Sequence, residues 1–330
     1  MPRKPNKKKK KRKADLVVGI DLGGTNMQIG VVSAKHKVLG RSRRKTEAAQ
    51  GTDHVIDRLV EGVKKACAKA DVSVRDLGAV GIATAGAVDI PRGVVLDSPN
   101  LKWIDLPLRQ ILEDRLGIPV VVDNDVNGAV WGEYCLGAGK GRGDVLGAWI
   151  GTGVGGGIVL NGSLYYGEFF TAGELGHTIL FPDGPEARRT VEHYCSRTGM
   201  ARIIQERLPA HPDSPVMEIT EGTGFISGSG QFAAAVERQC GLTIEVVNRG
   251  ADLLGLALAN CVTVLALDSI ILGGGVTEAL GQPYLERIRA SFKRHVFPDR
   301  CRACTIEATQ LKDDAGLLGA ALLAQAKAEE

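Results

Sequence analysis

The chain has 330 residues, 44% of them hydrophobic and 5% aromatic, a size that suits two globular domains better than one. No apolar run is long enough for a membrane span or a signal peptide, and the seven scattered cysteines show no framework spacing, which excludes membrane-spanning helices and a disulfide scaffold and predicts a cytoplasmic location. The formal charge of +3 is uneven: residues 2–13 hold nine basic and no acidic side chains, whereas the rest holds 32 basic and 38 acidic ones, a charge of −6.

The basic tail at residues 1–13 is predicted to be disordered, because a run of like charges repels itself and has no apolar surface to bury. A solvated extension is favoured over a contact with nucleic acid or another polyanion. The acidic remainder of the chain gives no electrostatic basis for binding nucleic acid, so no specific nucleic-acid partner is expected.

The first part of the chain alternates between strand and helix patterns. In chain order, the sequence predicts strands at 16–21, 28–33 and near 37–43, a helix at 53–70, a buried strand at 77–83, a helix at 106–116, a strand at 120–122, and a helix from 125 to about 134. The first two strands flank a glycine-rich turn and predict a hairpin.

The hairpin pattern returns in the second part of the chain. A strand at 146–150, a glycine turn at 151–157 and a strand at 158–160 repeat the order of the first hairpin, which indicates a weak internal duplication and two related domains. A third glycine turn, at 273–275, follows a strand at 269–272. Helical periodicity predicts helices at 253–267 and 315–326.

Three glycine turns at strand ends suit a polyphosphate ligand. Backbone N–H groups approach an anion closely only where no Cβ intervenes, and consecutive N–H groups form a concave anion site. The Walker A pattern is absent, and the second turn satisfies G-x-G-x-x-G but leads into a strand, where the dinucleotide fingerprint requires a helix.

The first turn also carries an acid at the end of its strand, Asp21. This carboxylate is a candidate Mg²⁺ ligand through water, and the turn that follows is a candidate cradle for the β- and γ-phosphates. A tight hairpin can also use two glycines for structural reasons alone, so one such turn does not decide between the two interpretations. Three such turns, two of them with threonine, favour phosphate.

Six segments occur in one known family in the same order. They are GIDLGGTN at 19–26, SPNLKW at 98–103, VDNDVN at 122–127, GTGVGGG at 151–157, GELGH at 173–177 and LGGG at 272–275. On these segments the chain resembles the ROK (repressor, open reading frame, kinase) family of sugar kinases, and within it the glucokinases, from about Asp15 onward.

The resemblance implies a fold and an activity. It implies an α/β protein with the two-domain actin-like ATPase (ribonuclease H-like) fold and an interdomain cleft, with a small domain at 14–124 plus about 314–330 and a large one at 125–313. It implies ATP-dependent phosphorylation of glucose at O6, with ATP and Mg²⁺ bound, hexose and ATP as partners, no membrane partner, and a homodimer or homotetramer.

The resemblance also implies roles for particular residues. Asp125 looks like the catalytic base, and its position after a strand and at a helix start would keep it ionised; a simple helix cap is the alternative. The implied hydroxyl ligands of the hexose are Asn100, Asn124, Asp125, Glu174, His177 and Glu192. The implied nucleotide-binding residues are Gly23, Gly24, Thr25, Asn26, Thr152, Gly153, Gly273, Gly274 and Gly275.

The chain departs from the family at one metal site. Much of the family completes a zinc site with three cysteines soon after the histidine equivalent to His177, but here the segment 186–192 is shorter and has no cysteine, and Cys195 cannot supply three thiolates. No zinc is therefore expected, and His177 is free to bond the sugar directly. The shortening leaves Glu192 the least secure of the sugar ligands, and Cys301 and Cys304 are interpreted as ordinary thiols.

Two alternatives remain. A sugar-sensing repressor of the same family would carry a winged helix-turn-helix, for which the sequence before residue 16 leaves no room. A kinase for N-acetylglucosamine, N-acetylmannosamine, mannose or fructose, or one that uses polyphosphate as donor, is not distinguished by any motif.

Overall fold

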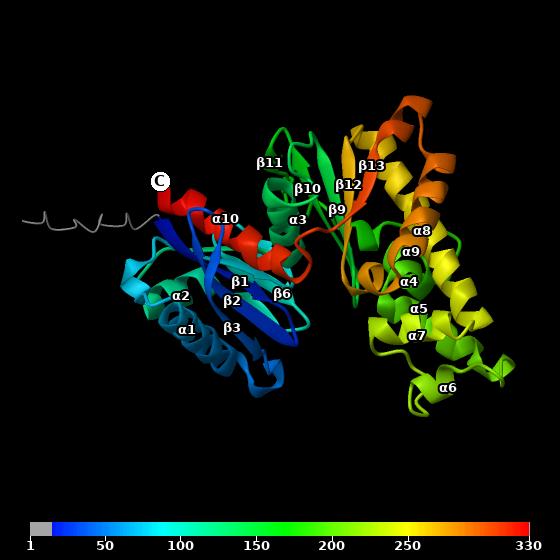
Figure 1. The fold of residues 1–330 in the computed structure, drawn as a ribbon, viewed down its shortest axis with the longest axis horizontal. Coiled ribbons are helices and arrows are strands. Elements are labelled where there is room, and N and C mark those ends of the chain that lie inside the picture. The colour runs from blue at the N-terminus through cyan, green and yellow to red at the C-terminus, as the bar shows by residue number, and fades with distance from the viewer. Residues whose placement is uncertain (1–14, 330) are drawn as a thin grey trace, which may run out of the picture. The chain divides into compact units, whose positions relative to one another are not determined.

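The computed structural model describes residues 15–329, so the predicted disordered tail lies outside the described residues. The chain divides into two compact units (Figure 1). Among the described residues, unit 1 contains 15–129 and 316–329, and unit 2 contains 130–315. None of the described helices is both long and apolar enough to cross a membrane.

Unit 1 is built on a five-stranded sheet in the order β3-β2-β1-β4-β8. Its strands are β1 (Leu16–Leu22), β2 (Asn26–Ser33), β3 (Val38–Lys45), β4 (Val80–Thr84) and β8 (Val120–Asn124). β1 pairs antiparallel with β2 and parallel with β4, which in turn pairs parallel with β8. The predicted strands are confirmed, except that β4 starts at Val80 because Leu77 closes a 3-10 turn.

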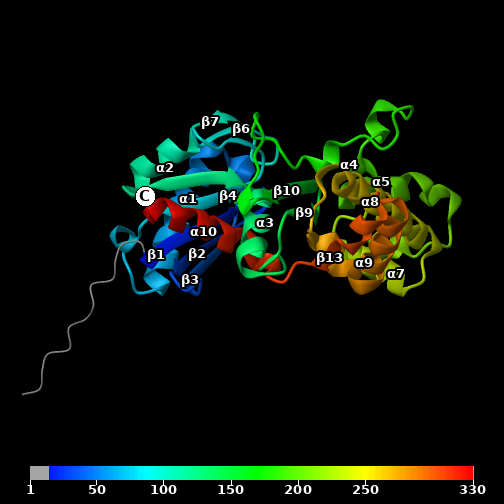
Figure 2. The ribbon, with the colours of Figure 1, turned by 90° about the horizontal axis from the view of Figure 1, so that it is seen from above.

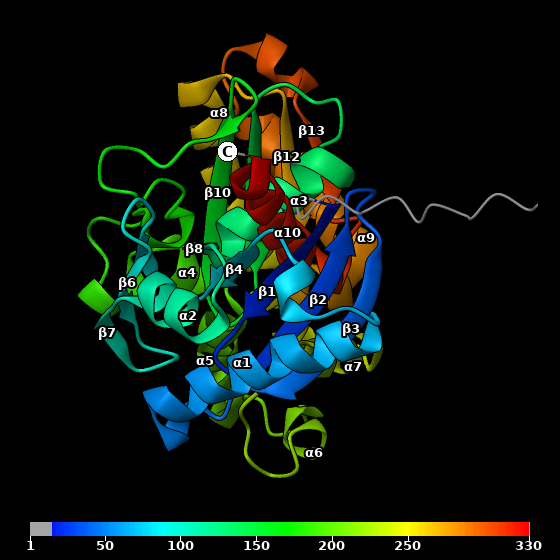
Figure 3. The same ribbon diagram turned by 90° about the vertical axis from the view of Figure 1, so that its left-hand side faces the viewer.

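Helices cover both faces of this sheet. α1 (Thr52–Lys69) and α2 (Leu108–Leu116) bury their apolar sides on one face, where α1 lies beside β2 and β3 (Figure 3). α10 (Ala315–Glu329) lies against the other face, beside β1 and β4 (Figure 2). A small sheet of β5 (Ala87–Asp89), β6 (Val94–Ser98) and β7 (Trp103–Leu106) follows β4.

Two glycines allow α10 to approach the sheet. A Cβ on Gly19 of β1 would lie 2.0 Å from the Leu317 carbonyl oxygen, and one on Gly81 of β4 would lie 1.9 Å from that of Ala320. Neither position tolerates a side chain without moving the helix. The close docking of α10 therefore depends on glycine at both strands.

Gly81→Ala is expected to lower the thermal midpoint of unfolding, because overpacking of this kind costs about 1–3 kcal/mol. The matched control is Gly230→Ala in a helix of unit 2, where the added Cβ meets nothing within 4 Å and the better helix propensity stabilises by up to about 1 kcal/mol. Differential scanning calorimetry compares the two. Equal midpoints for Gly81→Ala and the wild type would contradict the docking of α10.

Unit 2 repeats the topology of unit 1. Its sheet has the order β11-β10-β9-β12-β13, with β9 (Val145–Ile150), β10 (Val154–Leu160), β11 (Ser163–Leu164), β12 (Ser269–Gly273) and β13 (Thr305–Ala308). β9 pairs antiparallel with β10 and parallel with β12, as β1 does with β2 and β4. The internal duplication predicted from the two hairpins is confirmed by this topology.

The second glycine turn is shorter than predicted. β10 begins at Val154 rather than Ile158, so the turn is confined to Gly151–Gly153 and the following glycines lie within a strand. Packing at Gly156 requires the absence of a side chain, because a Cβ there would lie 2.4 Å from the carbonyl oxygen of Gly173. Gly155, Gly156 and Gly157 thus lie within β10 and outside the turn.

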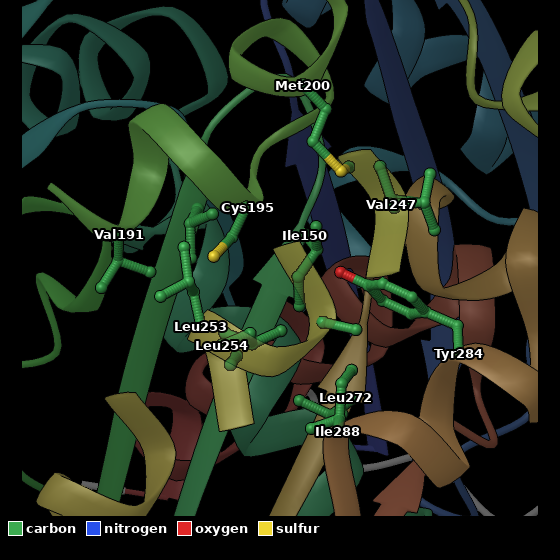
Figure 4. Packing of buried hydrophobic residues seen from close by; sticks show 14 of the residues in the cluster. Ile150, Val191, Cys195, Met200, Val247, Leu253, Leu254, Leu272, Tyr284 and Ile288 are labelled. Atoms are coloured by element: carbon green, nitrogen blue, oxygen red, sulfur yellow. The ribbon is translucent and has the colours of Figure 1, made fainter. Parts of the chain in front are cut away.

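The helices of unit 2 gather mainly on one face of its sheet. They are α4 (Val191–Cys195), α5 (Arg197–Arg207), α6 (Val216–Ile219), α7 (Ser229–Glu237), α8 (Gly241–Leu265) and α9 (Gly275–His295); α3 (Asp125–Leu136) begins in unit 1. Figure 4 shows the core between sheet and helices, which includes Ile150, Val191, Cys195, Met200, Leu253, Leu254, Leu272, Tyr284 and Ile288. α8 begins twelve residues before the predicted helix at 253.

A buried carboxylate joins the two ends of unit 2. The side chain of Glu133 on α3 is 0% exposed. Its oxygens accept hydrogen bonds from the backbone N–H groups of Ala138 at 2.8 Å and Leu311 at 2.7 Å, and from the hydroxyl of Thr309. Glu133 thus fastens the start of unit 2 to the segment that precedes α10.

Candidate active site

Three parallel strands of unit 1 end at one edge of its sheet. Asp21 of β1 lies beside Ala83 of β4, and Ala83 lies beside Asp123 of β8. Neighbouring strands are about 4.8 Å apart, so roughly 10 Å separate Asp21 from the Asp123–Asp125 segment along this edge. The sheet brings the predicted Mg²⁺ ligand and the predicted base to the same edge.

Asp125 is the first residue of α3, and Asn124 caps the helix. The Asn124 side-chain oxygen accepts from the backbone N–H groups of Val126 at 2.9 Å and Asn127 at 3.1 Å, and its amide nitrogen donates to the carbonyl of Gly86 at 3.0 Å. Asp125 also accepts from the Val126 N–H at 3.0 Å. Asp125 therefore lies at the positive end of the helix dipole, a position that favours acidic residues.

The buried side chain of Asp123 bonds two residues at the start of α3. It is 1% exposed, and its Oδ1 accepts from the backbone N–H of Asn124 at 2.7 Å and from the side-chain amide of Asn127 at 3.1 Å. Hydrogen bonds to a buried carboxylate are among the stronger ones in proteins. Asp123 therefore anchors the residues on either side of Asp125.

Asn100 lies against the first glycine turn. A Cβ on Gly24 would be 2.7 Å from the Cβ of Asn100, so only glycine allows this approach. The turn itself is closed by a bond from the Gly23 N–H to the Asn26 carbonyl at 3.0 Å and by the Thr46 hydroxyl, which donates to the Gly23 carbonyl at 2.6 Å. The predicted sugar ligand and the predicted phosphate turn are neighbours.

In unit 2, Glu192 lies beside the second glycine turn. Its carboxylate accepts from the backbone N–H of Val154 at 2.9 Å, and a Cβ on Gly153 would lie 2.3 Å from the same oxygen. Thr152, in the middle of this turn, is exposed. One carboxylate thus borders the predicted phosphate-binding residues Thr152 and Gly153.

Glu174 and His177 lie in the loop after β11. The His177 Nε2 is 3.8 Å from a Glu174 carboxylate oxygen, and their side chains are 70% and 55% exposed, so both are accessible to a ligand. The loop is anchored near Glu192, because the N–H of Val191 donates to the carbonyl of Thr178 at 3.0 Å. The three predicted sugar ligands of unit 2 lie on adjoining segments.

The third glycine turn packs tightly on β9. A Cβ on Gly273 would lie 2.4 Å from the ring of Trp149, and one on Gly274, whose φ is 89°, would lie 2.5 Å from the Ile150 carbonyl oxygen. Packing alone therefore requires glycine at 273 and 274. Gly275 begins α9, next to the Ser229 hydroxyl.

Arg197 was not predicted from the sequence as a site residue. Its guanidinium donates to the Thr152 hydroxyl at 2.7 Å and to the Ser227 carbonyl, and its backbone N–H donates to the Gly151 carbonyl at 2.9 Å. An arginine between Ser196 and Thr198 carries no motif. Only the fold reveals that it borders the second glycine turn.

The ROK family model matches residues 17–327 of the chain. This chain belongs to the ROK family. The glucokinase of Streptomyces coelicolor is 34% identical to it, over 94% of this chain and 98% of its own length. An N-acetylmannosamine kinase of Salmonella heidelberg is 29% identical to it, over 93% of this chain and 98% of its own length.

A solved structure extends the comparison. The ROK-family glucokinase of Streptomyces griseus, in complex with glucose and AMPPNP, is 34% identical and matches with a TM-score of 0.81, over 94% of this chain and 99% of its own. The predicted actin-like α/β fold is confirmed for this ROK-family chain. The comparisons support a sugar kinase as its class.

The segment after His177 in this ROK-family chain is held by protein contacts. Arg188 pairs with Glu206 at 2.8 Å, and the ring of Phe181 packs edge-on against that of Tyr194. Cys195 is buried; its thiol donates to a backbone carbonyl, and burial raises its pKa. Within residues 15–329, no group of three or more His, Cys, Asp or Glu side chains is arranged to hold a metal ion.

Proposed function

We propose that this protein is an ATP-dependent glucokinase that phosphorylates glucose at O6, with Asp125 as the general base. The observation that carries the proposal is the position of Asp125 at the start of α3, on the sheet edge that Asp21 shares. Phosphoryl transfer needs an aligned acceptor hydroxyl, a base to take its proton and neutralisation of the phosphate charge. Asp125 takes the proton of O6 as the bond from O6 to the γ-phosphorus forms, while the bond from that phosphorus to the bridging oxygen breaks and ADP leaves.

The glycine turns hold the nucleotide phosphates in this proposal. Their ligands are the backbone and side-chain groups of Gly23, Gly24, Thr25, Asn26, Thr152 and Gly153, with Gly273, Gly274 and Gly275 beside the adenosine. The family likeness to a structure that binds glucose and AMPPNP supports ATP as the donor.

Asp21 fits the Mg²⁺ that such kinases use. Mg²⁺ prefers hard oxygen ligands and is usually held by one or two carboxylates together with water and phosphate. Residue 316 is glycine, and a Cβ there would be 2.9 Å from the Asp21 Cγ, so a larger residue at this position would crowd the carboxylate. The ion, when bound, supplies charge neutralisation at the phosphates.

The hexose hydroxyls are bound by amides, carboxylates and an imidazole, each of which pairs with hydroxyl donors or acceptors. We assign this role to Asn100, Asn124, Glu174, His177 and Glu192. The Asn124 oxygen already accepts two backbone hydrogen bonds, so its amide N–H that does not face Gly86 is the group left for the sugar.

The unpaired thiols of all seven cysteines, each among the described residues, are consistent with a cytoplasmic enzyme.

A kinase for another hexose is the second candidate, favoured by the likeness to an N-acetylmannosamine kinase. A coupled assay separates the two. Glucose, mannose, fructose, N-acetylglucosamine and N-acetylmannosamine are each offered with ATP and with polyphosphate. Glucose with ATP is expected to give the highest kcat/KM.

Each other result of this assay has a defined meaning. A higher kcat/KM with an acetamido sugar would overturn glucose as the substrate but keep the kinase. A higher rate with polyphosphate would overturn ATP as the main donor. If the protein bound one of these sugars but phosphorylated none of them, a sugar-sensing function would be favoured over a kinase.

A further inference from the structure

Arg197 is fixed directly behind the second glycine turn. It is the first residue of α5, where Ser196 caps the helix by accepting from the Gly199 N–H at 2.9 Å. The Arg197 backbone N–H holds the Gly151 carbonyl at 2.9 Å, and its side chain reaches forward to the Thr152 hydroxyl at 2.7 Å. The backbone of Arg197 thus bonds the first residue of the turn, and its side chain bonds the second.

The charge of Arg197 has no carboxylate partner among residues 15–329, since its described contacts are a hydroxyl and two backbone carbonyls. Arg207, on the same helix, forms two bonds to the Glu245 carboxylate at 2.9 and 2.7 Å. A guanidinium has five N–H donors, of which Arg197 uses one toward Thr152 and one toward Ser227. Positive charge and donors therefore remain at the turn.

Arg197 also links two of the glycine turns within unit 2. Its contact with the Ser227 carbonyl ties the turn at Gly151–Gly153 to the segment before α7. Two residues further along, the Ser229 hydroxyl would lie 3.0 Å from a Cβ on Gly275. The second and third glycine turns thus lie close together. Arg197 supplies positive charge there, and the Glu192 carboxylate lies on the same turn beside Gly153.

We propose that Arg197 binds the terminal phosphates of the nucleotide and at the same time positions the Thr152 hydroxyl toward them. This inference rests on the proposed function, because it takes the turn at Gly151–Gly153 as a phosphate site. A planar guanidinium suits phosphate oxygens, which accept paired N–H donors. A phosphate oxygen that bonds the Thr152 hydroxyl lies within reach of the same guanidinium.

The test compares nucleotide affinities of the full chain by isothermal titration calorimetry with AMPPNP and with AMP. Arg197→Ala is expected to weaken AMPPNP binding about 10- to 100-fold, the loss of one or two charge-assisted bonds, and to leave AMP binding within about twofold. Arg197→Lys keeps the positive charge but loses the planar pair of N–H donors, so it is expected to recover part of the affinity. Arg207→Ala, which removes an equal charge from the same helix, is expected to match the wild type.

Two results would overturn the inference. One is an AMPPNP affinity of Arg197→Ala equal to that of Arg207→Ala. The other is an equal loss for AMP and AMPPNP, which would assign Arg197 a purely structural role in the turn. A wild type that binds AMPPNP through Arg197 but phosphorylates no sugar would overturn the proposed function and leave this inference standing.

Discussion

Asp125→Asn is expected to lower kcat by about 10²- to 10⁴-fold, the usual contribution of a positioned general base. The amide keeps the shape of the side chain but does not accept the O6 proton. The backbone around residue 125 is held by hydrogen bonds to the Asn124 and Asp123 side chains, and the substitution changes neither of these residues. The dissociation constant for glucose is therefore expected to rise much less than kcat falls.

Steady-state kinetics with ATP and glucose, together with calorimetric titration of glucose, measure both quantities. Asp114→Asn is the matched control, because Asp114 is an exposed acid on α2 that accepts a bond only from the nearby Gln110 among the described contacts. The control is expected to keep wild-type kcat. Near-normal turnover in Asp125→Asn would show that another group takes the proton.

Glu133→Ala is expected to destabilise unit 2 by about 3–5 kcal/mol, because it leaves buried donors without an acceptor. The donors at Ala138, Thr309 and Leu311 all point at this one carboxylate. Urea unfolding followed by circular dichroism measures the shift in the transition midpoint.

Two further variants make the Glu133 result specific. Glu133→Gln keeps one acceptor oxygen and is expected to lose less stability than Glu133→Ala. Glu286→Ala removes an exposed acid from α9 and is expected to leave the midpoint unchanged. A midpoint for Glu133→Ala that equals that of the Glu286 variant would contradict a stabilising role for the Glu133 carboxylate.

The strand edge that carries Asp21 and Asp125 could be predicted from the sequence, because Asp21 ends one run rich in β-branched residues and the Asp123-Asn124-Asp125 segment follows another. Parallel strands in an α/β domain end at one edge, so polar residues after them meet. The hairpin turns could be predicted for the same local reason. These features depend on residues within about six positions of one another.

Other features depend on contacts between distant segments and could not be predicted. α8 carries Gly250 and Gly255, which weaken the helical pattern. In the structure these glycines admit the Met200 sulfur and the Ile288 carbonyl, so tertiary packing accounts for glycine inside this helix. In the same way, Arg197 follows no pattern and gains its position only because α5 starts behind the turn.

The assignment of a cap also required the structure. The sequence Asp123-Asn124-Asp125 offers three residues that cap helices well. Only the hydrogen bonds show that Asn124 caps while Asp123 is buried beneath it. The division of roles among adjacent polar residues is a matter of backbone geometry, which composition does not encode.

The two glycines beneath α10 also bear on how substitution data for this protein should be interpreted. Gly19 and Gly81 touch helix backbone and no proposed ligand, yet variants at either position are expected to lose activity because the sheet that carries Asp21 and Asp125 loses its support. A saturation mutagenesis screen scored by growth alone would rank Gly19 and Gly81 with the catalytic and ligand-binding residues. Only abundance measured beside turnover would separate scaffold from chemistry.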